Sequence, residues 1–141
     1  VETDDALLVC DMTRSQDVKK LVETLKSEER HEYKFHTRVM RPWGSATTIL
    51  ENTIYRIRML EIQPGKSLSL QSHQQRSEHW VVLEGTADVQ RGDEKVILQK
   101  NESAFIPKRM HHRLGNTGDT TLQIIEVQQG EYLGDDDIER F

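Results

Sequence analysis

Residues 65–85, GKSLSLQSHQQRSEHWVVLEG, run from one glycine to another and hold three side chains that can bind a metal ion. On a strand, Gln71 and His73 are two residues apart, so their side chains leave the same face of the sheet. Four residues separate His73 from Glu78, which is room for a tight antiparallel return that sets the carboxylate opposite the imidazole. The stretch therefore predicts a hairpin that carries an amide, an imidazole and a carboxylate.

A fourth candidate ligand follows at His112. Pro107 turns the chain, and His112 opens a short strand segment, 112–114, before Asn116 ends it. His111 lies on the alternate face and is expected to face solvent, although an exchange of roles between the two histidines stays open. Two imidazoles, an amide oxygen and a carboxylate suit a divalent metal, zinc first, with Mn, Fe, Co or Ni also suited. The predicted metal ligands are Gln71, His73, Glu78 and His112.

Short β-branched runs surround this stretch, with turn residues between them. They cover residues 46–50, 54–62, 81–83, 95–98 and 121–127. Many short strands at close spacing are typical of a sandwich or barrel. A hydrophobic content of 35% fits strands that keep one face in water. The predicted fold is an all-β antiparallel jelly-roll barrel over about residues 45–130.

Residues 1–37 differ from the barrel region and predict a strand-helix arm with a linker. ALLVCD, residues 6–11, predicts a short buried strand. After Ser15, an apolar stripe with the spacing i, i+3, i+4, i+7 predicts an amphipathic helix over residues 15–29. The stripe consists of Val18, Leu21, Val22 and Leu25. Charged residues without a period follow over 28–36, so the second domain is placed at residues 38–141.

Composition excludes several classes of protein. The chain has 141 residues with 24 acidic and 19 basic side chains, which predicts one compact domain with an arm. A formal charge of -5 without a basic stripe argues against a nucleic-acid partner. Cys10 is the only cysteine, which excludes an internal disulfide and a multi-thiolate zinc site.

Cellular location is predicted from what the sequence lacks. The longest apolar run, residues 6–10, is too short to cross a membrane, and no signal-peptide pattern opens the chain. A cytoplasmic protein without a membrane partner is therefore expected. The start at Val1 without methionine and the end at Phe141 predict a piece of a longer chain.

The spacing Gly65-x5-Gln71-x-His73-x4-Glu78-x6-Gly85 resembles the first cupin motif, with glutamine in the leading histidine position. Pro107-x-Arg109-x2-His112-x3-Asn116 resembles the second, with Arg109 where that motif usually has glycine. Residues 71–80, together with 41–44 and 126–134, are similar to the type II mannose-6-phosphate isomerase domain. This resemblance covers about residues 38–141. Residues 6–11 and 15–26 resemble the end of the guanylyltransferase half of bifunctional mannose-1-phosphate guanylyltransferase/mannose-6-phosphate isomerases.

The resemblance implies metal-dependent interconversion of mannose 6-phosphate and fructose 6-phosphate, which feeds GDP-mannose synthesis for polysaccharides. Such an isomerase needs a Lewis acid on the sugar oxygens and a base beside the carbon. A substrate phosphate calls for cations, and Arg41, Lys66 and Arg76 are the candidates. Arg76 lies beside the ligands and is the predicted catalytic residue. The base stays open, because His79 should leave the opposite face and the face of Glu126 is unassigned.

Gln74 and Gln75 replace two histidines of the family pattern, so a proton-transfer role of imidazole would be lost. A non-catalytic cupin module for sugar-phosphate binding or dimerisation therefore stays open beside the isomerase. A cupin oxygenase is disfavoured by Gln71. Cupins commonly dimerise through an edge strand, and residues 6–11 could supply one, so a homodimer is expected.

Three further expectations concern side-chain environment. Arg56 and Arg58 share a strand face, expected to be outward and solvated; if that face is inward, they line the pocket. Trp43 and Trp80 are expected to pack in the core or at the barrel mouth rather than stack on sugar. The acidic run 134–137 is expected to be a solvated tail.

Overall fold

The computed structural model describes residues 1–2, 7–28 and 37–141. The chain divides into two compact units, Val1–Val39 and Met40–Phe141, and each is described by itself. In the described ranges, no helix combines the length and apolar character needed to cross a membrane.

The first unit contains the predicted helix, but in shorter form. A 3₁₀ helix, η1 (Met12–Asp17), leads into α1 (Val18–Ser27). Asp11 caps η1, because its Oδ1 accepts a hydrogen bond of 2.8 Å from the backbone N–H of Thr13. The predicted linker falls almost entirely on residues outside the described ranges.

The predicted strand at residues 6–11 is wrong over its described part, residues 7–11. Leu7 forms only an isolated bridge with Glu2, and Val9 is 83% exposed. Among the described residues of this unit there is no sheet for the run to join, and an isolated bridge does not bury its side chains. The homodimer stays a prediction, but the edge strand from which it was expected is not formed by residues 7–11.

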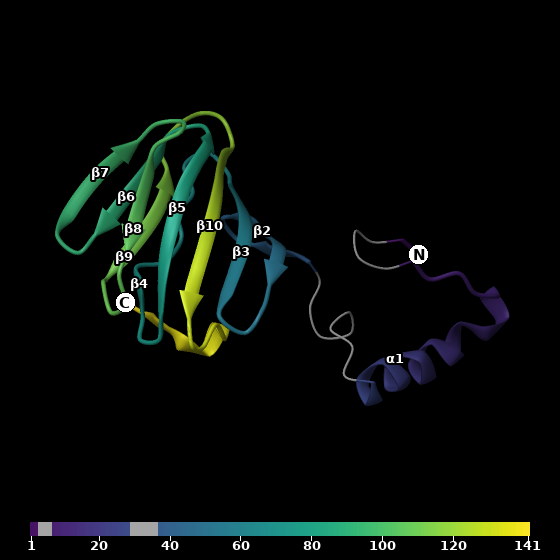
Figure 1. Cartoon of the computed structure of the whole chain (residues 1–141). Helices are drawn as coiled ribbons and strands as arrows, with labels where there is room; N and C mark the ends of the chain where they lie inside the picture. The colour runs from purple at the N-terminus through teal and green to yellow at the C-terminus, as the bar shows by residue number, and fades with distance from the viewer. Residues whose placement is uncertain (3–6, 29–36) are drawn as a thin grey trace. The chain divides into compact units, whose positions relative to one another are not determined.

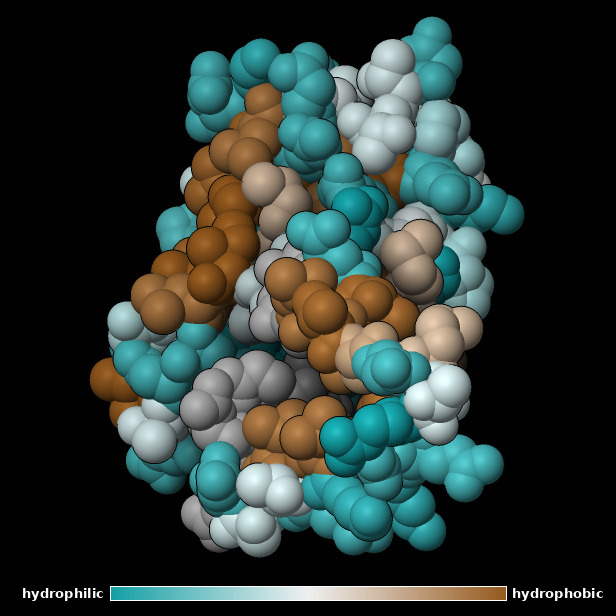
Figure 2. Space-filling model, turned by 90° about the vertical axis from the view of Figure 1, so that its right-hand side faces the viewer, coloured by the Kyte–Doolittle hydropathy of each residue, from teal (hydrophilic) through white to brown (hydrophobic). Residues whose placement is uncertain are grey.

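Apolar side chains of α1 remain at the surface of the unit. Leu21 is 53% exposed and Val22 is 36% exposed, so the predicted stripe is present but not buried. On the face of the molecule that Figure 2 shows, hydrophobic residues (brown) gather in patches at the surface among hydrophilic residues (teal).

The second unit is built from two antiparallel sheets that enclose the core (Figure 1). The six-stranded sheet has the order β1 (Arg38–Arg41), β2 (Gly44–Glu51), β3 (Tyr55–Ile62), β10 (Leu122–Gly130), β5 (Arg76–Glu84), β8 (Ser103–Ile106). The five-stranded sheet has the order β11 (Ile138–Arg140), β4 (Gln71–His73), β9 (His112–Asn116), β6 (Ala87–Arg91), β7 (Glu94–Leu98). The predicted all-β jelly-roll barrel is confirmed.

The inward face of β10 changes from apolar to polar along the strand. Leu122 and Ile124 are fully buried in the hydrophobic core. Two residues further along the same face, Glu126 and Gln128 are also buried, at 1% and 0% exposed. Since side chains alternate along a strand, this places a polar interior at one end of the barrel.

The connection from β4 to β5 is not the predicted hairpin. β4 belongs to the five-stranded sheet and β5 to the six-stranded sheet, so the chain crosses from one sheet to the other between His73 and Arg76. His73 and Glu78 still face each other, because both side chains point into the space between the sheets.

The predicted solvated tail at residues 134–137 is right for the side chains of Asp135 and Asp136, which are exposed, and wrong for Asp137, which is buried. These residues include the 3₁₀ helix η3 (Asp135–Asp137), which leads into β11. Strand β11 pairs with β4. The carboxylate of Asp137 is buried and accepts hydrogen bonds from the backbone N–H groups of Gln74 and Gln75, at 3.2 and 3.3 Å. These two hydrogen bonds satisfy backbone donors of the connection between β4 and β5.

Gly44 and Gly65 both have positive φ and form a matched pair for mutation. A Cβ on Gly44 would lie 1.9 Å from the backbone oxygen of Glu61, whereas one on Gly65 would meet nothing within 4 Å. Gly44→Ala is expected to lower the free energy of unfolding by about 3 kcal/mol or more, and Gly65→Ala by about 1 kcal/mol. Urea denaturation of both variants tests this, and equal losses would contradict it.

Candidate metal centre

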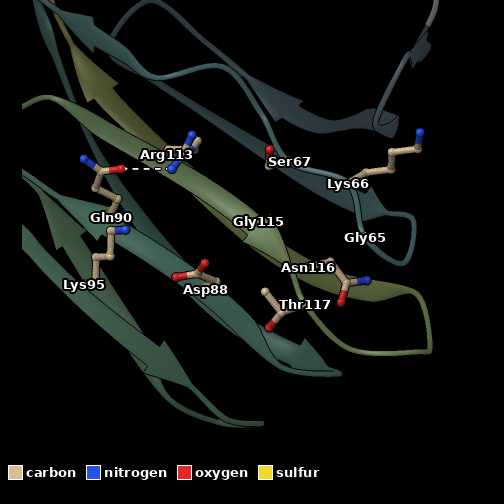
Figure 3. Close-up of a pocket in the computed structure, with 10 residues that line it drawn as sticks. All are labelled: Gly65, Lys66, Ser67, Asp88, Gln90, Lys95, Arg113, Gly115, Asn116 and Thr117. Atoms are coloured by element: carbon tan, nitrogen blue, oxygen red, sulfur yellow. Dashed lines mark hydrogen bonds between the residues drawn. The ribbon is translucent and has the colours of Figure 1, made fainter.

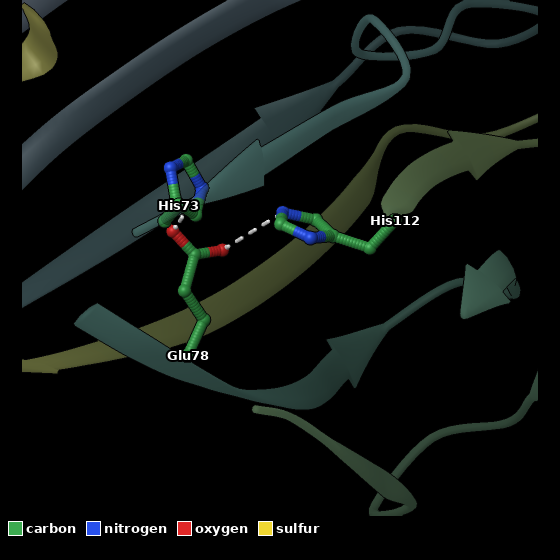
Figure 4. Close-up of side chains that lie close together, drawn as sticks. All are labelled: His73, Glu78 and His112. Atoms are coloured by element: carbon green, nitrogen blue, oxygen red, sulfur yellow. Dashed lines mark ion pairs between the residues drawn. The ribbon is translucent and has the colours of Figure 1, made fainter. Parts of the chain in front are cut away.

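Three buried side chains from three strands meet inside the barrel (Figure 4). His73 Nε2 of β4 lies 3.1 Å from Glu78 Oε1 of β5, and His112 Nε2 of β9 lies 3.7 Å from Glu78 Oε2. One ligand atom from each residue falls within 4.8 Å of the others. The two imidazoles and the carboxylate form a nitrogen and oxygen donor set that suits zinc and related divalent metals.

The hydrogen bonds of His112 leave its inward nitrogen available as a ligand. Its Nδ1 lies 2.8 Å from the carbonyl oxygen of Met110. Because a carbonyl only accepts, Nδ1 carries the hydrogen and Nε2 keeps its lone pair. Burial lowers the pKa of His112 and so favours neutral imidazole, although Glu78 opposes this shift.

Unpartnered atoms point to a missing group at this cluster. His112 Nε2 and Glu78 Oε2 are buried, and neither has a hydrogen-bond partner among the described residues. Unsatisfied polar atoms are rare in protein interiors and call for an explanation. A metal ion bound by His73, Glu78 and His112 would satisfy both atoms, so the residues present fit such a group.

Glu78 is held ionised by its neighbours. Burial by itself would raise its pKa, but the hydrogen bond and charge of His73, with the charges of His112 and Arg76, lower the pKa below its usual value. Gln128 Nε2 donates a hydrogen bond of 2.9 Å to Glu78 Oε1. Gln128 is absent from the predicted site, although its even spacing from Ile124 on β10 could have placed it on the inward face.

The fourth predicted ligand, Gln71, lies beside the cluster. It is 8% exposed and pairs with His112 in the register between β4 and β9. The hydroxyl of Ser69 donates a long hydrogen bond, 3.5 Å, to its side-chain oxygen. Gln71 also lines a cavity of about 290 Å³.

Four arginines line this cavity together with Trp43, Leu68 and Asp135. They are Arg41, Arg58, Arg76 and Arg140. Guanidinium groups recognise phosphate and carboxylate groups by paired hydrogen bonds. The cavity is therefore suited to an anionic ligand next to the candidate metal ligands.

The expected outward, solvated face for Arg56 and Arg58 is wrong; of the two, Arg58 lines the cavity, whereas Arg56 pairs with Glu51 and Asp135. Their side chains are 14% and 18% exposed. Arg58 pairs with the buried carboxylate of Glu126, which also accepts a hydrogen bond of 3.3 Å from Trp80 Nε1. Burial raises the pKa of Glu126, and Arg58 opposes that shift. The face of Glu126, unassigned from the sequence, is inward.

Arg76 and Arg41 both line the cavity, but they differ in exposure and in their contacts with the protein. Arg76 is 1% exposed; its Nη1 donates 2.8 Å to the carbonyl oxygen of Gly134, and its Nε lies 3.4 Å from Glu78. The side chain of Arg41 is 46% exposed and lies 3.4 Å from Asp135. Arg76 is thus buried and held by the protein through its Nε and Nη1, whereas the side chain of Arg41 is about half exposed.

Other residues singled out in the sequence lie outside the cluster. Lys66 lines a separate pocket and does not meet the candidate ligands. His79 and His111 are exposed as predicted, so the roles of His111 and His112 are not exchanged. Gln74 and Gln75 are exposed too, and Gln74 donates to Glu139 at 3.1 Å. Trp80 is fully buried in the core.

Arg109, which stands where the second cupin motif usually has glycine, adopts the left-handed backbone conformation with a φ of 65°. Its backbone N–H donates a hydrogen bond of 2.7 Å to the carbonyl oxygen of His73. The bond ties the segment before β9 to β4, so it holds the strands of His73 and His112 together. The turn is kept without glycine.

Solved structures show the same fold at low sequence identity. A cupin-2 domain from Rhodospirillum rubrum has a TM-score of 0.61 and 16% identity, covering 69% of this chain and 64% of its own. A predicted oxalate decarboxylase from Thermotoga maritima has a TM-score of 0.59 and 22% identity, covering 66% of this chain and 90% of its own. These likenesses establish the cupin fold.

Curated relatives share much higher identity with this chain. Xanthan biosynthesis protein XanB of Xanthomonas campestris is 48% identical over 100% of the chain, which covers 30% of XanB. Mannose-1-phosphate guanylyltransferase RfbM of Salmonella typhimurium is 47% identical over 99% of the chain, which covers 29% of RfbM. The chain thus spans about 30% of the length of these relatives. The family model described as mannose-6-phosphate isomerase C-terminal matches residues 28–141, so the chain belongs to that family.

Proposed function

We propose that this domain catalyses the metal-dependent interconversion of mannose 6-phosphate and fructose 6-phosphate. The observation that carries the proposal is the buried cluster of His73, Glu78 and His112 beside an arginine-lined cavity. A divalent metal, zinc first, would be held by these three side chains with Gln71 and would polarise the sugar oxygens. The family supports the substrate class.

The arginines have two different roles in this proposal. Arg76 touches Glu78 and Gly134, so it holds the ligand carboxylate in place and keeps it ionised. Arg41 and Arg140 are exposed at the cavity and are the groups that bind the substrate phosphate. Among the described residues, the side chain of Arg140 has no ion pair, so its charge is available to the phosphate.

The relatives suggest the setting of this reaction. XanB and AlgA of Pseudomonas putida are named xanthan and alginate biosynthesis proteins, and RfbM is named a mannose-1-phosphate guanylyltransferase. We propose that this chain is the C-terminal part of a bifunctional guanylyltransferase/isomerase that supplies GDP-mannose for polysaccharide synthesis.

A non-catalytic sugar-phosphate module remains the second candidate. Asp135, the carboxylate that lines the cavity, is engaged by Arg41 and Arg56 and is not a free base. Gln74 and Gln75 are exposed, and the lining of the described cavity contains no histidine that could move a proton.

A coupled assay of fructose 6-phosphate formation from mannose 6-phosphate separates the two candidates. Wild-type protein with added zinc should turn over, EDTA should stop it, and His73→Ala should lower kcat/KM more than about 100-fold. His79→Ala, an exposed imidazole on the same β5 strand as Glu78, is the control and should stay within about twofold. Saturable binding without turnover would support the non-catalytic module instead.

The phosphate assignment gives a further prediction. Arg41→Gln and Arg140→Gln should each raise KM for mannose 6-phosphate about tenfold with kcat changed less than about twofold, because they bind a group that does not react. Lys100→Gln, an exposed cation remote in sequence from the cavity lining, should leave KM unchanged. A fall in kcat at constant KM would contradict the assignment.

A further inference from the structure

A second pocket lies on the outer face of the five-stranded sheet (Figure 3). Side chains alternate along β9, so His112 and Leu114 point inward while Arg113 points outward. The pocket has a volume of about 410 Å³, and the side chains that matter for binding are Lys66, Ser67, Asp88, Gln90, Lys95 and Arg113. It shares no lining residue with the arginine-lined cavity.

The pocket gathers positive charge on an acidic chain. Two cations, Lys95 and Arg113, face the pocket with one carboxylate, Asp88, and a third, Lys66, lines its edge with the ammonium turned away (Figure 3), while the chain carries a formal charge of -5. In the part of the chain that the structure describes, neither lysine nor Asp88 forms an ion pair. A concave site with uncompensated cations attracts anions.

Arg113 is oriented before any ligand arrives. Its Nη2 donates a hydrogen bond of 3.2 Å to Gln90 Oε1, and Gln90 Nε2 donates one of 3.3 Å to the carbonyl oxygen of Gly92. Gln90 pairs with Lys95 on one side and with Arg113 on the other, so the three form a row across β7, β6 and β9. The remaining guanidinium donors and the Lys95 ammonium can meet one phosphate.

Residues 65–67 form one wall of the pocket, and this segment is hydrogen-bonded to β9. Asn116 N donates to Lys66 O and Gly65 N donates to Asn116 O, both at 2.9 Å. Gly115 permits this close approach, since a Cβ there would lie 3.3 Å from Ser67 Cβ. A site that is already formed loses little conformational freedom when a ligand binds.

We propose that this pocket is a second site, which binds a phosphorylated sugar. Arg113 and Lys95 bind the phosphate, whereas the ammonium of Lys66 points away from both of them (Figure 3). Asp88 repels a bare phosphate, but it accepts hydrogen bonds from sugar hydroxyls, and Ser67 adds a hydroxyl to the lining of the pocket. The carboxylate therefore selects a hydroxylated phosphate ester over inorganic phosphate.

The test follows amide chemical shifts of the full chain during titration with mannose 6-phosphate. Saturable shifts are expected at Gln90, Lys95 and Gly115, and Arg113→Gln should weaken the Kd from these shifts at least about tenfold. The same variant should leave shifts near Arg41 unchanged, which separates this site from the isomerase site. Lys100→Gln is the matched exposed control.

Asp88→Asn and inorganic phosphate complete the experiment. The variant should bind inorganic phosphate more tightly than wild type and should lose selectivity for mannose 6-phosphate over phosphate, because it removes a charge that repels both ligands and replaces one acceptor oxygen for the sugar hydroxyls by a donor. Shifts confined to the surroundings of Arg41, or a Kd at Gln90 and Gly115 that Arg113→Gln does not change, would overturn the second site. Equal affinity of wild type for phosphate and mannose 6-phosphate would overturn its selectivity for a sugar.

Discussion

Glu78→Gln is expected to lower the affinity of the domain for zinc more than about 100-fold, or more than about 2.8 kcal/mol. Glu78 is the one anionic group of the cluster, and its two oxygens face His73 and His112 at 3.1 and 3.7 Å. Glutamine keeps the size of the side chain and an oxygen that can accept from Gln128. The variant therefore removes the charge and leaves the shape.

Competition between the protein and a zinc chelator measures this affinity. Elemental analysis of protein purified without nickel-affinity chromatography gives its metal content. Glu84→Gln is the control, because Glu84 lies on the same strand but is exposed and pairs with Lys100 at 2.7 Å. Its zinc affinity should equal that of wild type. If Glu78→Gln still binds one zinc ion with wild-type affinity, the cluster is not the metal site.

Arg76→Met is expected to lower the free energy of unfolding by about 3–5 kcal/mol, the largest stability loss predicted for this chain. Methionine fills much of the same space, but it leaves buried acids without their counter-charge and the carbonyl of Gly134 without its donor. The acids are Glu78 and Asp137, 3.4 and 3.8 Å from the guanidinium. All three side chains are at most 3% exposed, so water cannot replace the arginine.

Urea denaturation followed by fluorescence measures this loss. Lys100→Met removes the cation of an ion pair whose side chains are 58% and 60% exposed, and it should cost at most about 1 kcal/mol. A loss below about 1 kcal/mol for Arg76→Met would show that Arg76 does not neutralise these buried acids.

The shared face of the candidate metal ligands could be predicted because it depends on local periodicity. Alternation along a strand places Gln71 and His73 on one face and separates His111 from His112, whatever the strands pair with. The strand runs could be predicted for the same reason. The spacing between His73 and Glu78 could not distinguish a hairpin from a crossing between sheets, because both need only a short turn.

The errors concern partners that lie far away in the sequence. Asp137 meets Gln74, 63 residues earlier, and Arg58 meets Glu126, 68 residues later. Taken alone, an acidic run or an arginine on a strand is most stable in water, so local patterns favour exposure. Only the closed barrel supplies the buried donors and acids that reverse this preference.

The cluster takes His73 and His112 from one sheet and Glu78 from the other, so its three donors come together only when the barrel has closed. An unfolded chain would have to gather them against its own entropy. A ligand that binds only the closed state shifts the folding equilibrium by mass action. Each tenfold excess of zinc over its dissociation constant should thus add about 1.4 kcal/mol to domain stability, and a chelator should lower the melting temperature.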